Sequence, residues 1–362
     1  MSSATRVLII GTGLIGTSAG LALRERGVSV WLSDTDQASV RLAAQLGAGE
    51  PLPDDGGRAR ADVALIAVPP DAVAATLADA QARGLARWYT DVASVKVLPV
   101  RQARELGCDL ASYVPGHPLA GRERHGPAAA RADLFLGRTW ALCPLPETSP
   151  GALSAVTALA TSCGADTVIT RAATHDRWVA LVSHAPHVVA AAMAARLEKA
   201  PPGALGLAGQ GLRDVTRIAA GDPRLWGQIL AANAAPVARV LAEVAADLAK
   251  AASTLVTYAD APAAEDAVSG LLRRGRAGTS RIPGKHGGTP RDFTLVQVVI
   301  RDQPGELARL FAAAGDAGVN IEDVRIEHSP GLPVGVAELY VRPAEAAFLL
   351  AAAEKGGWPV RR

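Results

Sequence analysis

The stretches VLIIGTGLIG (residues 7–16) and VSVWLSD (residues 28–34) decide how the first half of this chain folds. Gly11, Gly13 and Gly16 give the spacing G-x-G-x-x-G after an apolar run that is typical of a buried strand. In such a unit the first glycine permits a tight turn, the second lets the backbone approach a pyrophosphate, and the third lets the helix pack close to the strand. Free N–H groups at the start of the helix then attract the phosphates. The pattern predicts a dinucleotide-binding strand–helix–strand unit.

Asp34 ends the second apolar run, where a dinucleotide-binding unit carries an acidic residue about 20 residues after the glycines. Its carboxylate would accept hydrogen bonds from the adenine-ribose hydroxyls and would repel a 2′-phosphate. Thr35, Asp36 and Gln37 follow it and supply no cation to offset that repulsion. The pattern therefore predicts NAD rather than NADP. The alternative is an ordinary glycine-rich turn followed by a surface aspartate.

Short apolar runs alternate with helical patterns through the first half, which predicts a parallel, doubly wound α/β sheet. Because ligands bind beyond the carboxyl ends of such strands, Val68, Pro69 and Ser94 are expected to line the cofactor cleft. Each proline at 69 and 70, taken alone, is equally explained by a turn. We expect strands at residues 7–10, 28–32, 63–68, 89–92, 140–143 and 167–169, the last two finishing the sheet, with helices at 18–26 and 71–83 among them. The expected cofactor contacts are Gly11, Thr12, Gly13, Leu14, Ile15, Gly16, Asp34, Val68, Pro69 and Ser94.

At about residue 174 the alternating strand and helix patterns give way to helical patterns alone. Helical patterns at 176–199, 206–219, 223–233 and 235–258 predict an all-helical domain, and its apolar, Ala-rich helices favour packing against a second subunit in a homodimer. Residues 273–290, rich in Gly, Pro and basic side chains, are expected to form a linker. Patterns at 294–300, 307–317, 321–327, 336–341 and 344–355 then predict a small β-α-β-β-α domain. The expected domains are residues 1–170, 171–272 and 291–362, with the linker at 273–290.

The composition narrows the class of protein. The chain of 362 residues is 49% hydrophobic and 20% charged, enough for buried cores in two or three domains. Its net charge of +2 comes from basic residues spread along the chain, which argues against a nucleic-acid surface. Cys108, Cys143 and Cys163 have neither metal-ligand spacing nor the pattern of a disulfide framework, which fits a reduced, cytoplasmic setting. No signal-peptide pattern and no run of about 18 apolar residues is present, so no membrane span is expected.

Histidines are scarce, and most lie in motifs that could carry chemistry. His117 lies in GHPLAGRE (residues 116–123), a turn-rich motif that is a typical place for a catalytic imidazole. His175 in THD is equally explained by a helix N-cap region. His184 and His187 in SHAPH could bind a metal together with His175, but no carboxylate or cysteine completes an obvious ligand set, so no metal is expected. His184 is interpreted as structural.

Two arginines in the motif GLRDVTR (residues 211–217) form a second candidate. Arg213 and Arg217 are expected to share one helix face at i, i+4. Arg213 could instead pair with Asp214 or Glu123, and Asp214 is interpreted as a structural partner.

These blocks together resemble the prephenate dehydrogenase family of tyrosine biosynthesis. The matching motifs run in the family's order from about residue 7 to 226, and the segments RDQPGELARLF and AGVNIEDVRIEH of the tail resemble an ACT domain, a regulatory amino-acid-binding module. The resemblance implies a Rossmann-type first domain, a helical second domain and a ferredoxin-like third. Arg122 and Arg124 make the stretch after His117 unusually basic, and the linker is not part of the common core. The matching motifs of the catalytic region are GTGLIGTS, TDVASVK, GHPLAGRE, THD, SHAPH and GLRDVTRIAAGDPRLW.

The resemblance implies NAD-dependent oxidative decarboxylation of prephenate to 4-hydroxyphenylpyruvate. His117 would hydrogen-bond the C4 hydroxyl and take its proton, and Ser94 would bond the same hydroxyl and help to place the nicotinamide. Arg217 would clamp a substrate carboxylate with its guanidinium fork. The residues implied to line the substrate pocket are His175, Ser183, His187 and Arg213, with Glu123 orienting Arg or His side chains from behind.

Other functions stay open at this point. Arogenate carries an ammonium where prephenate has a keto group, and residues 183–187 offer no acidic side chain to bind it, which favours prephenate. A second relative, 4-amino-4-deoxyprephenate, has an amine at C4. From a different class, the chain could be a non-catalytic amino-acid sensor that holds NAD as a structural ligand. A hydroxy-acid dehydrogenase on the same fold would release no CO₂.

The resemblance of the tail implies feedback control by tyrosine. In related modules, turns at the positions of residues 302–305 and 318–320 contact a bound amino acid. The alternative is a domain that only assists assembly. The expected effector contacts are Asp302, Pro304, Gly305, Gly318 and Asn320.

Overall fold

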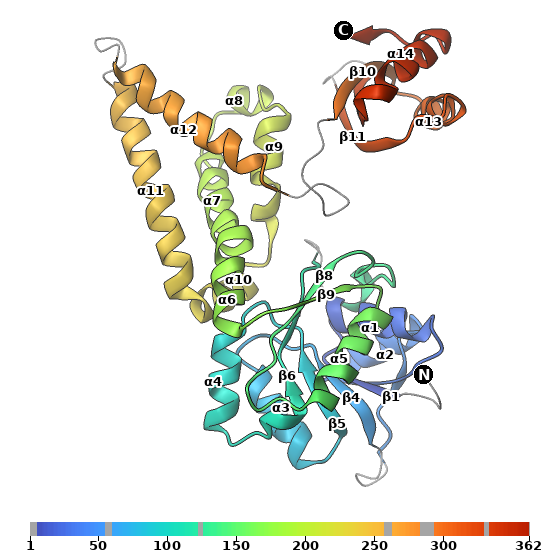
Figure 1. Ribbon diagram of the computed structural model, residues 1–362, viewed down its shortest axis with the longest axis vertical. Helices are drawn as coiled ribbons and strands as arrows, with labels where there is room; N and C mark the ends of the chain where they lie inside the picture. The colour runs from blue at the N-terminus through green and yellow to red at the C-terminus, as the bar shows by residue number, and fades with distance from the viewer. Residues whose placement is uncertain are drawn as a thin grey trace. The chain divides into compact units, whose positions relative to one another are not determined.

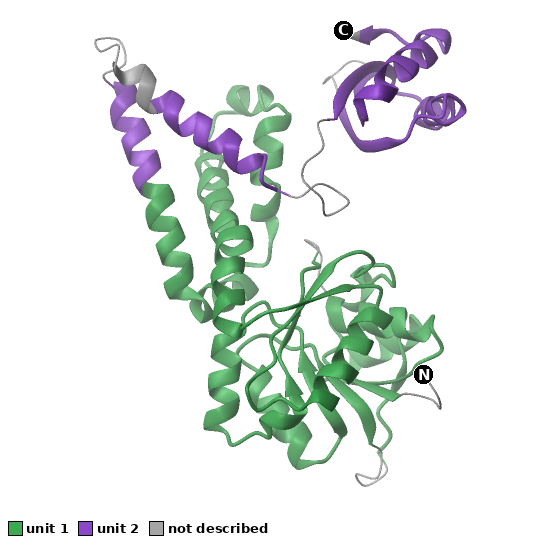
Figure 2. Cartoon of the chain, viewed as in Figure 1, with its two compact units in different colours: residues 1–245 green, residues 246–362 purple. Residues whose placement is uncertain are grey.

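The computed structural model describes residues 6–54, 60–121, 126–256, 263–282, 293–328 and 333–361. The chain divides into two compact units, residues 1–245 and 246–362, coloured separately in Figure 2. The first unit holds two sheets and most of the helical region. The second holds the last long helices and a small C-terminal domain.

A six-stranded parallel sheet in the order β3-β2-β1-β4-β5-β6 forms the centre of the first unit (Figure 1). This order and the helices on both faces confirm the predicted doubly wound, Rossmann-type fold. The strands are β1 (Arg6–Ile10), β2 (Ser29–Ser33), β3 (Glu50–Pro51), β4 (Ala61–Ile66), β5 (Ala86–Asp91) and β6 (Tyr113–Val114).

Alternating strand residues build the two apolar cores of this sheet. Val7 and Ile9 of β1 lie in one buried cluster and Leu8 between them lies in the other, because successive side chains point to opposite faces. The first cluster is covered by α1 (Leu14–Arg24), α2 (Gln37–Gln45) and α5 (Pro150–Ser162). The second is covered by α3 (Val73–Ala82) and α4 (Val97–Glu105).

A separate three-stranded sheet follows, which corrects one prediction. The strands at 140–143 and 167–169 do not finish the parallel sheet. They are β8 (Thr139–Leu142) and β9 (Asp166–Ile169), and β8 pairs antiparallel with β7 (Gly116–Pro118). The chain leaves β6 at Pro115, which has no N–H for a ladder, and β7 then offers β8 a new edge. This second sheet carries His117.

The helical region of the first unit begins with one long, interrupted helix. It runs through α6 (Ala172–Val179), the π-helical turn η3 (Ala180–His184) and α7 (Ala185–Ala194). The π turn lies just before Pro186, which has no N–H to continue the α-helical ladder. The helices that follow are η4 (Ala195–Leu197), α8 (Pro202–Gly206), α9 (Gln210–Thr216), η5 (Arg217–Ala220), α10 (Pro223–Ala232) and α11 (Ala234–Val256).

Residues 172–197 are long and apolar enough, by length and composition alone, to cross a membrane, and the bent pair α10–α11 passes the same test if counted as one span. This indication is weak, because the core helix of a globular protein also meets the criterion. Residues 172–197 carry buried polar residues, His175, Asp176, His184 and His187, which make hydrogen bonds or ring contacts with other parts of the protein. A site-bearing helix explains these contacts directly.

In the second unit, helix occupies the first part of the predicted linker. Helix α12 (Ala263–Thr279) continues past residue 273, so the linker prediction was wrong over 273–279. Arginine and alanine are good helix formers, and Arg274 pairs with Asp247 of α11 at 2.6 Å. Residues 283–290 lie outside the described residues.

The small C-terminal domain has the predicted β-α-β-β-α order and one more short strand, β13. Its antiparallel sheet runs β11-β12-β10-β13, the arrangement of a ferredoxin-like fold. A separate apolar cluster beneath α13 and α14 forms its core. The elements are β10 (Thr294–Arg301), α13 (Glu306–Asp316), β11 (Ile321–His328), β12 (Val334–Val341), η6 (Pro343–Glu345), α14 (Ala346–Lys355) and β13 (Val360–Arg361).

Candidate active site

The three glycines after β1 form the expected cradle. Gly11 has φ +103°, and a Cβ there would lie 2.3 Å from the carbonyl oxygen of Ala67. A Cβ on Gly16 would lie 1.9 Å from the carbonyl oxygen of Gly11, so only glycine lets α1 pack this close to the turn. At Gly13, by contrast, a Cβ would meet nothing within 4 Å. The open space at Gly13 and the start of α1, which has no side-chain cap, fit a pyrophosphate.

Asp34 is tied into this cradle, a contact that the sequence did not reveal. Its Oδ2 accepts hydrogen bonds from the backbone N and the Oγ1 of Thr12, at 2.6 Å and 3.0 Å, and its Oδ1 accepts one from the backbone N of Asp36 at 2.9 Å. Each carboxylate oxygen can accept more than one bond. Asp34 can therefore shape the loop and still receive a ribose hydroxyl.

The other expected cofactor contacts lie around the same turn. Leu14 and Ile15 open α1 and are half-buried. Val68 follows β4, and its Cγ1 would lie 3.3 Å from a Cβ on Gly11. Pro69 next to it is exposed. The carboxyl ends of β1 and β4 thus bring Gly11 and Val68 together, as the sequence predicts.

Ser94 follows a strand of the six-stranded sheet, whereas His117 lies in the three-stranded sheet. Ser94 follows β5, and its buried Oγ has no hydrogen-bond partner in the part of the chain that the structure describes. A buried hydroxyl without a partner is costly, so this hydroxyl is available to a ligand or a water molecule. His117 lies in the middle of β7, partly buried, and its Nδ1 lies 2.9 Å from Nε2 of His175.

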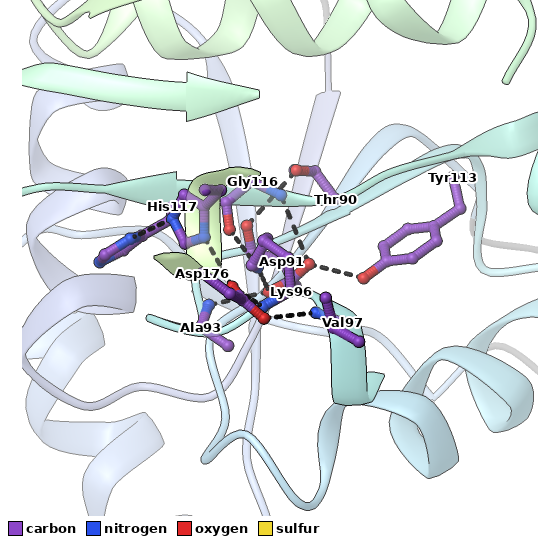
Figure 3. A network of polar contacts seen from close by, with 10 residues as sticks. Thr90, Asp91, Ala93, Lys96, Val97, Tyr113, Gly116, His117 and Asp176 are labelled. Atoms are coloured by element: carbon purple, nitrogen blue, oxygen red, sulfur yellow. Dashed lines mark hydrogen bonds and ion pairs between the residues drawn. The ribbon is translucent and has the colours of Figure 1, made fainter. Parts of the chain in front are cut away.

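A chain of polar contacts continues from His117 into the helical region. Nδ1 of His175 lies 2.8 Å from Oδ1 of Asp176. The carboxylate of Asp176 accepts the backbone N–H groups of Lys96 and Val97, each at 2.8 Å, and so caps the start of α4 (Figure 3). His175 and Asp176 are each only 2% exposed. The alternative interpretation of THD as a helix N-cap region was wrong, because His175 and Asp176 lie inside α6, whose N-cap is Arg171; Asp176 instead bonds the start of another helix, α4.

A buried ion pair supports the strand that carries His117. The ammonium of Lys96 bonds both the carboxylate of Asp91 and the carbonyl oxygen of Gly116, and all of the Lys96 and Asp91 side chains are inaccessible to solvent. The hydroxyl of Tyr113 donates to Oδ2 of Asp91 at 2.6 Å. The backbone next to His117 is thereby fixed. We call Asp91, Lys96, Tyr113, His175 and Asp176 the Lys96 network; all but His175 are labelled in Figure 3.

Sequence reasoning used TDVASVK only for Ser94 and assigned no role to Asp91, Lys96, Tyr113 or Asp176. The available signal was a pair of opposite charges five residues apart in a segment otherwise apolar. Such residues are seldom buried unless they pair with one another.

The surroundings of His117 favour its neutral form. Burial lowers the pKa of His117 well below its usual 6.5, and the neighbouring His175, Lys96 and His184 lower it further. A neutral imidazole can accept a proton near neutral pH, as a general base requires.

His184 and His187 have separate partners in the helical region. The ring of His187 stacks on Trp226, with centroids 3.5 Å apart and planes at 10°, and burial lowers the pKa of His187. Nδ1 of His184 lies 3.1 Å from Nδ2 of Asn233, and burial lowers the pKa of His184 from 6.5 to about 4. Among the described residues no group of three or more His, Cys, Asp or Glu side chains is placed to hold a metal ion.

The remaining expected substrate residues are on the surface. Arg213 lies in α9, which ends at Thr216, and Arg217 is its C-cap in helical conformation and begins η5, so the expectation that the two share one helix face stays a prediction. Thr216 bonds the carbonyl of Leu212 at 2.7 Å, a contact typical of a bent or ending helix. Arg213, Arg217 and Ser183 of the π turn are all exposed. Glu123 lies outside the described residues.

The expected effector residues lie on two exposed turns of the C-terminal domain. Gly305, with φ +83°, precedes α13, and Gly318, with φ +70°, precedes β11. Asp302 and Pro304 are exposed beside Gly305. Nδ2 of Asn320 donates to Glu322 at 2.9 Å.

Comparisons with known proteins agree with this geometry. Residues 19–169 match the family model "Prephenate dehydrogenase, nucleotide-binding domain", and residues 171–267 match "Prephenate dehydrogenase, dimerization domain". The chain is 42% identical over 361 residues to the probable prephenate dehydrogenase NovF of Streptomyces niveus, covering 97% of this chain and 98% of that one. It is 34% identical over 257 residues to a cyclohexadienyl dehydrogenase of Zymomonas mobilis, covering 67% and 86%. A solved putative prephenate dehydrogenase of Corynebacterium glutamicum superposes with a TM-score of 0.68 at 27% identity, over 78% of this chain and 91% of that one.

Proposed function

Because this chain belongs to the prephenate dehydrogenase family, we propose that it oxidises and decarboxylates prephenate to 4-hydroxyphenylpyruvate with NAD⁺. The observation that carries the proposal is the pairing of a neutral imidazole, His117, with the unpartnered buried hydroxyl of Ser94. Ser94 follows β5 of the parallel sheet that also carries the glycine cradle, and His117 lies in β7 of the three-stranded sheet. The cofactor, when bound, supplies the acceptor for the hydride that leaves C4 of the ring.

His117 and Ser94 act on the C4 hydroxyl of the substrate in this proposal. As hydride leaves C4, positive charge develops on the attached oxygen, and Nε2 of His117 accepts its hydrogen bond and then its proton. The ring carboxylate leaves as CO₂, its bonding electrons complete the aromatic ring, and the phenolate oxygen takes the proton back from His117 to give 4-hydroxyphenylpyruvate. Ser94 holds the same hydroxyl in line, which places C4 toward the nicotinamide.

Residues of the helical region bind the rest of the substrate in this proposal. Arg217 clamps a carboxylate, because a guanidinium matches its geometry with two parallel bonds. His187 is held by the Trp226 ring and donates to the keto acid side chain. Arg213 and Ser183 complete the pocket, His175 is buried against His117 and acts through it, and Glu123 is proposed to orient neighbouring Arg or His side chains. The stretch Ser183–His187 contains no acid to match the ammonium of arogenate, which supports prephenate as the substrate.

Steady-state NADH formation with three substrates tests this choice. We expect kcat/KM to be highest for prephenate, with one CO₂ released per NADH. A preference for arogenate or 4-amino-4-deoxyprephenate would transfer the activity to an amine substrate, and NADH without CO₂ would point to an ordinary hydroxy-acid dehydrogenase. The variant His117→Gln should lower kcat by about 10³-fold while NAD binding stays unchanged. Absence of turnover with every cyclohexadienyl acid would favour a non-catalytic sensor.

We propose further that the helical region pairs two chains into a homodimer and that the C-terminal domain binds tyrosine as a feedback inhibitor. The match of residues 171–267 to a dimerization domain and the exposed Leu181, Val182 and Leu207 support the first idea. The ferredoxin-like topology and the two exposed glycine turns support the second. Cys108, Cys143 and Cys163 are free thiols, which supports a cytoplasmic setting.

A further inference from the structure

We propose that Asp176 and His175 are positioning residues that fix the tautomer of His117, so that its lone pair is on Nε2. The inference deepens the proposed function, since it rests on His117 acting as the base. It assigns a role to an aspartate that binds the backbone of Lys96 and Val97. The three side chains form one series of contacts from the start of α4 to β7; Asp176 and His117 at its two ends are labelled in Figure 3.

The direction of the first hydrogen bond follows from the partners of Asp176. Its Oδ1 already accepts the backbone N–H of Lys96, and its Oδ2 accepts that of Val97. These two N–H groups lie at the start of α4, where the helix dipole favours a negative charge. Asp176 is therefore an acceptor toward every partner. Nδ1 of His175, 2.8 Å from Oδ1, must carry the hydrogen and donate it.

The direction of the second hydrogen bond follows from the first. A neutral imidazole with its proton on Nδ1 has a lone pair on Nε2. Nε2 of His175 therefore accepts, and the group that donates to it is Nδ1 of His117, 2.9 Å away. His117 then has no proton on Nε2. The nitrogen that must receive the substrate's proton is thus left open by a chain of contacts that begins at a backbone cap.

Burial makes this orientation difficult to reverse. His175 and Asp176 are each 2% exposed, so water does not compete for their bonds. The two imidazole rings meet edge to face, with centroids 5.1 Å apart and planes at 78°, which leaves Nδ1 of His117 directed at His175. An aspartate that sets the tautomer of a catalytic histidine is a known device in hydrolases. Here a second histidine is interposed between them.

The wild-type chain offers a direct test that needs no enzymatic turnover. In a ¹⁵N-histidine NMR spectrum of the NAD-bound protein near pH 7, His117 should show a protonated Nδ1 and an unprotonated Nε2. Its signals are identified by their loss in His117→Gln. A proton on Nε2 of His117 would overturn the proposal even if the enzyme turns prephenate over. Failure to oxidise prephenate, with the expected tautomer present, would instead reject the proposed function alone.

The variant Asp176→Asn tests the origin of the tautomer. Its amide N–H can donate to Nδ1 of His175, which reverses both bonds and moves the His117 proton to Nε2. We expect kcat to fall by about 10²–10⁴-fold, the range spanned by the equivalent change in hydrolases and by the loss of a base, with KM for NAD within about twofold. Asp79→Asn, at an exposed position on α3, is the matched control and should leave kcat and the spectrum unchanged. A loss of kcat with the His117 tautomer unaltered contradicts the proposal.

A second variant guards against a misfolded Asp176→Asn, since Asp176 also caps α4. His175→Phe keeps the ring volume and leaves the cap in place but removes the acceptor for Nδ1 of His117. We expect His117 to show a mixture of tautomers and kcat to fall, with NAD binding retained. A wild-type tautomer in this variant would show that His175 does not set it.

Discussion

The Lys96 network and the arginine-bearing segment α9–η5 are built in opposite ways. Around His117 the side chains are buried and paired, and every bond has its donor and acceptor within the fold. Arg213 and Arg217 are exposed, on a helix that ends between them. We infer that the residues proposed for proton transfer are preorganised by buried contacts, whereas the arginines proposed for substrate binding lie on the exposed surface of α9–η5. The difference predicts that substitutions in the two regions will fail in different ways.

The largest expected effect is on stability, from Lys96→Met. Removing one member of a buried pair leaves the Asp91 carboxylate uncompensated, which typically costs about 3–5 kcal/mol in the free energy of unfolding. It also releases the carbonyl of Gly116, so the folded fraction should turn over more slowly. Urea unfolding measures the first effect and NADH formation the second.

Two controls separate the effect of burying the ion pair from the effect of leaving one charge without its partner. Arg104 pairs with Glu147 at 2.9 Å on the surface, and Arg104→Met should cost about 1 kcal/mol or less. The double variant Lys96→Met with Asp91→Asn should regain part of the stability, because no lone charge stays buried. If Lys96→Met alone were as stable as Arg104→Met, the buried pair would matter no more than a surface pair. The contrast between the Lys96 network and α9–η5 would then not hold.

Residues with a local signature could be predicted from the sequence, whereas residues held by long-range contacts could not. The glycine spacing, Asp34, Ser94 and His117 each have a local signature, because a turn or strand end defines their task within a few residues. Asp176 lies 80 residues from the Lys96 backbone that it binds, and no periodicity predicts such a contact.

The same limit explains the misplaced strands and the misplaced linker. β8 and β9 have ordinary strand composition, and their sheet is decided by which edge is available after Pro115. The basic run 273–279 looked like a linker because of its glycines, but its arginines extend α12 and one of them pairs with α11.

The next effect concerns the exposed side of the comparison, through Arg217→Lys. Lysine keeps the charge but loses the two-pronged geometry that a carboxylate needs. We expect KM for prephenate to rise by about tenfold, corresponding to about 1.4 kcal/mol, with kcat and the free energy of unfolding little changed. Steady-state kinetics and urea unfolding on the same preparation give both numbers. Arg101→Lys, an exposed position on α4, is the matched control.

The opposite pattern would break the comparison. If Arg217→Lys lowered kcat and stability as Lys96→Met does, α9–η5 would belong to the rigid part of the site.

The smallest expected effect is on the pH dependence of kcat/KM, which should reflect the buried region and not the exposed one. The pKa of His117 is lowered by burial and by His175, Lys96 and His184, so its basic form persists as the pH falls below 6.5. We expect kcat/KM to hold at pH 6.5 and to decline only at lower pH, as His117 is protonated.

Stability should decline over an overlapping but distinguishable range. The pKa of His184 falls from 6.5 in the unfolded chain to about 4 in the fold, so between these values the unfolded state binds more protons. Stability is therefore highest above pH 6.5 and is lost as the pH falls toward 4. The variant His184→Gln, whose amide oxygen can still accept from Asn233, should flatten this loss and leave the limb of kcat/KM in place. If the declines in stability and in kcat/KM at low pH shifted together in this variant, the loss of activity would reflect unfolding. The protonation of His117 could then not be observed separately.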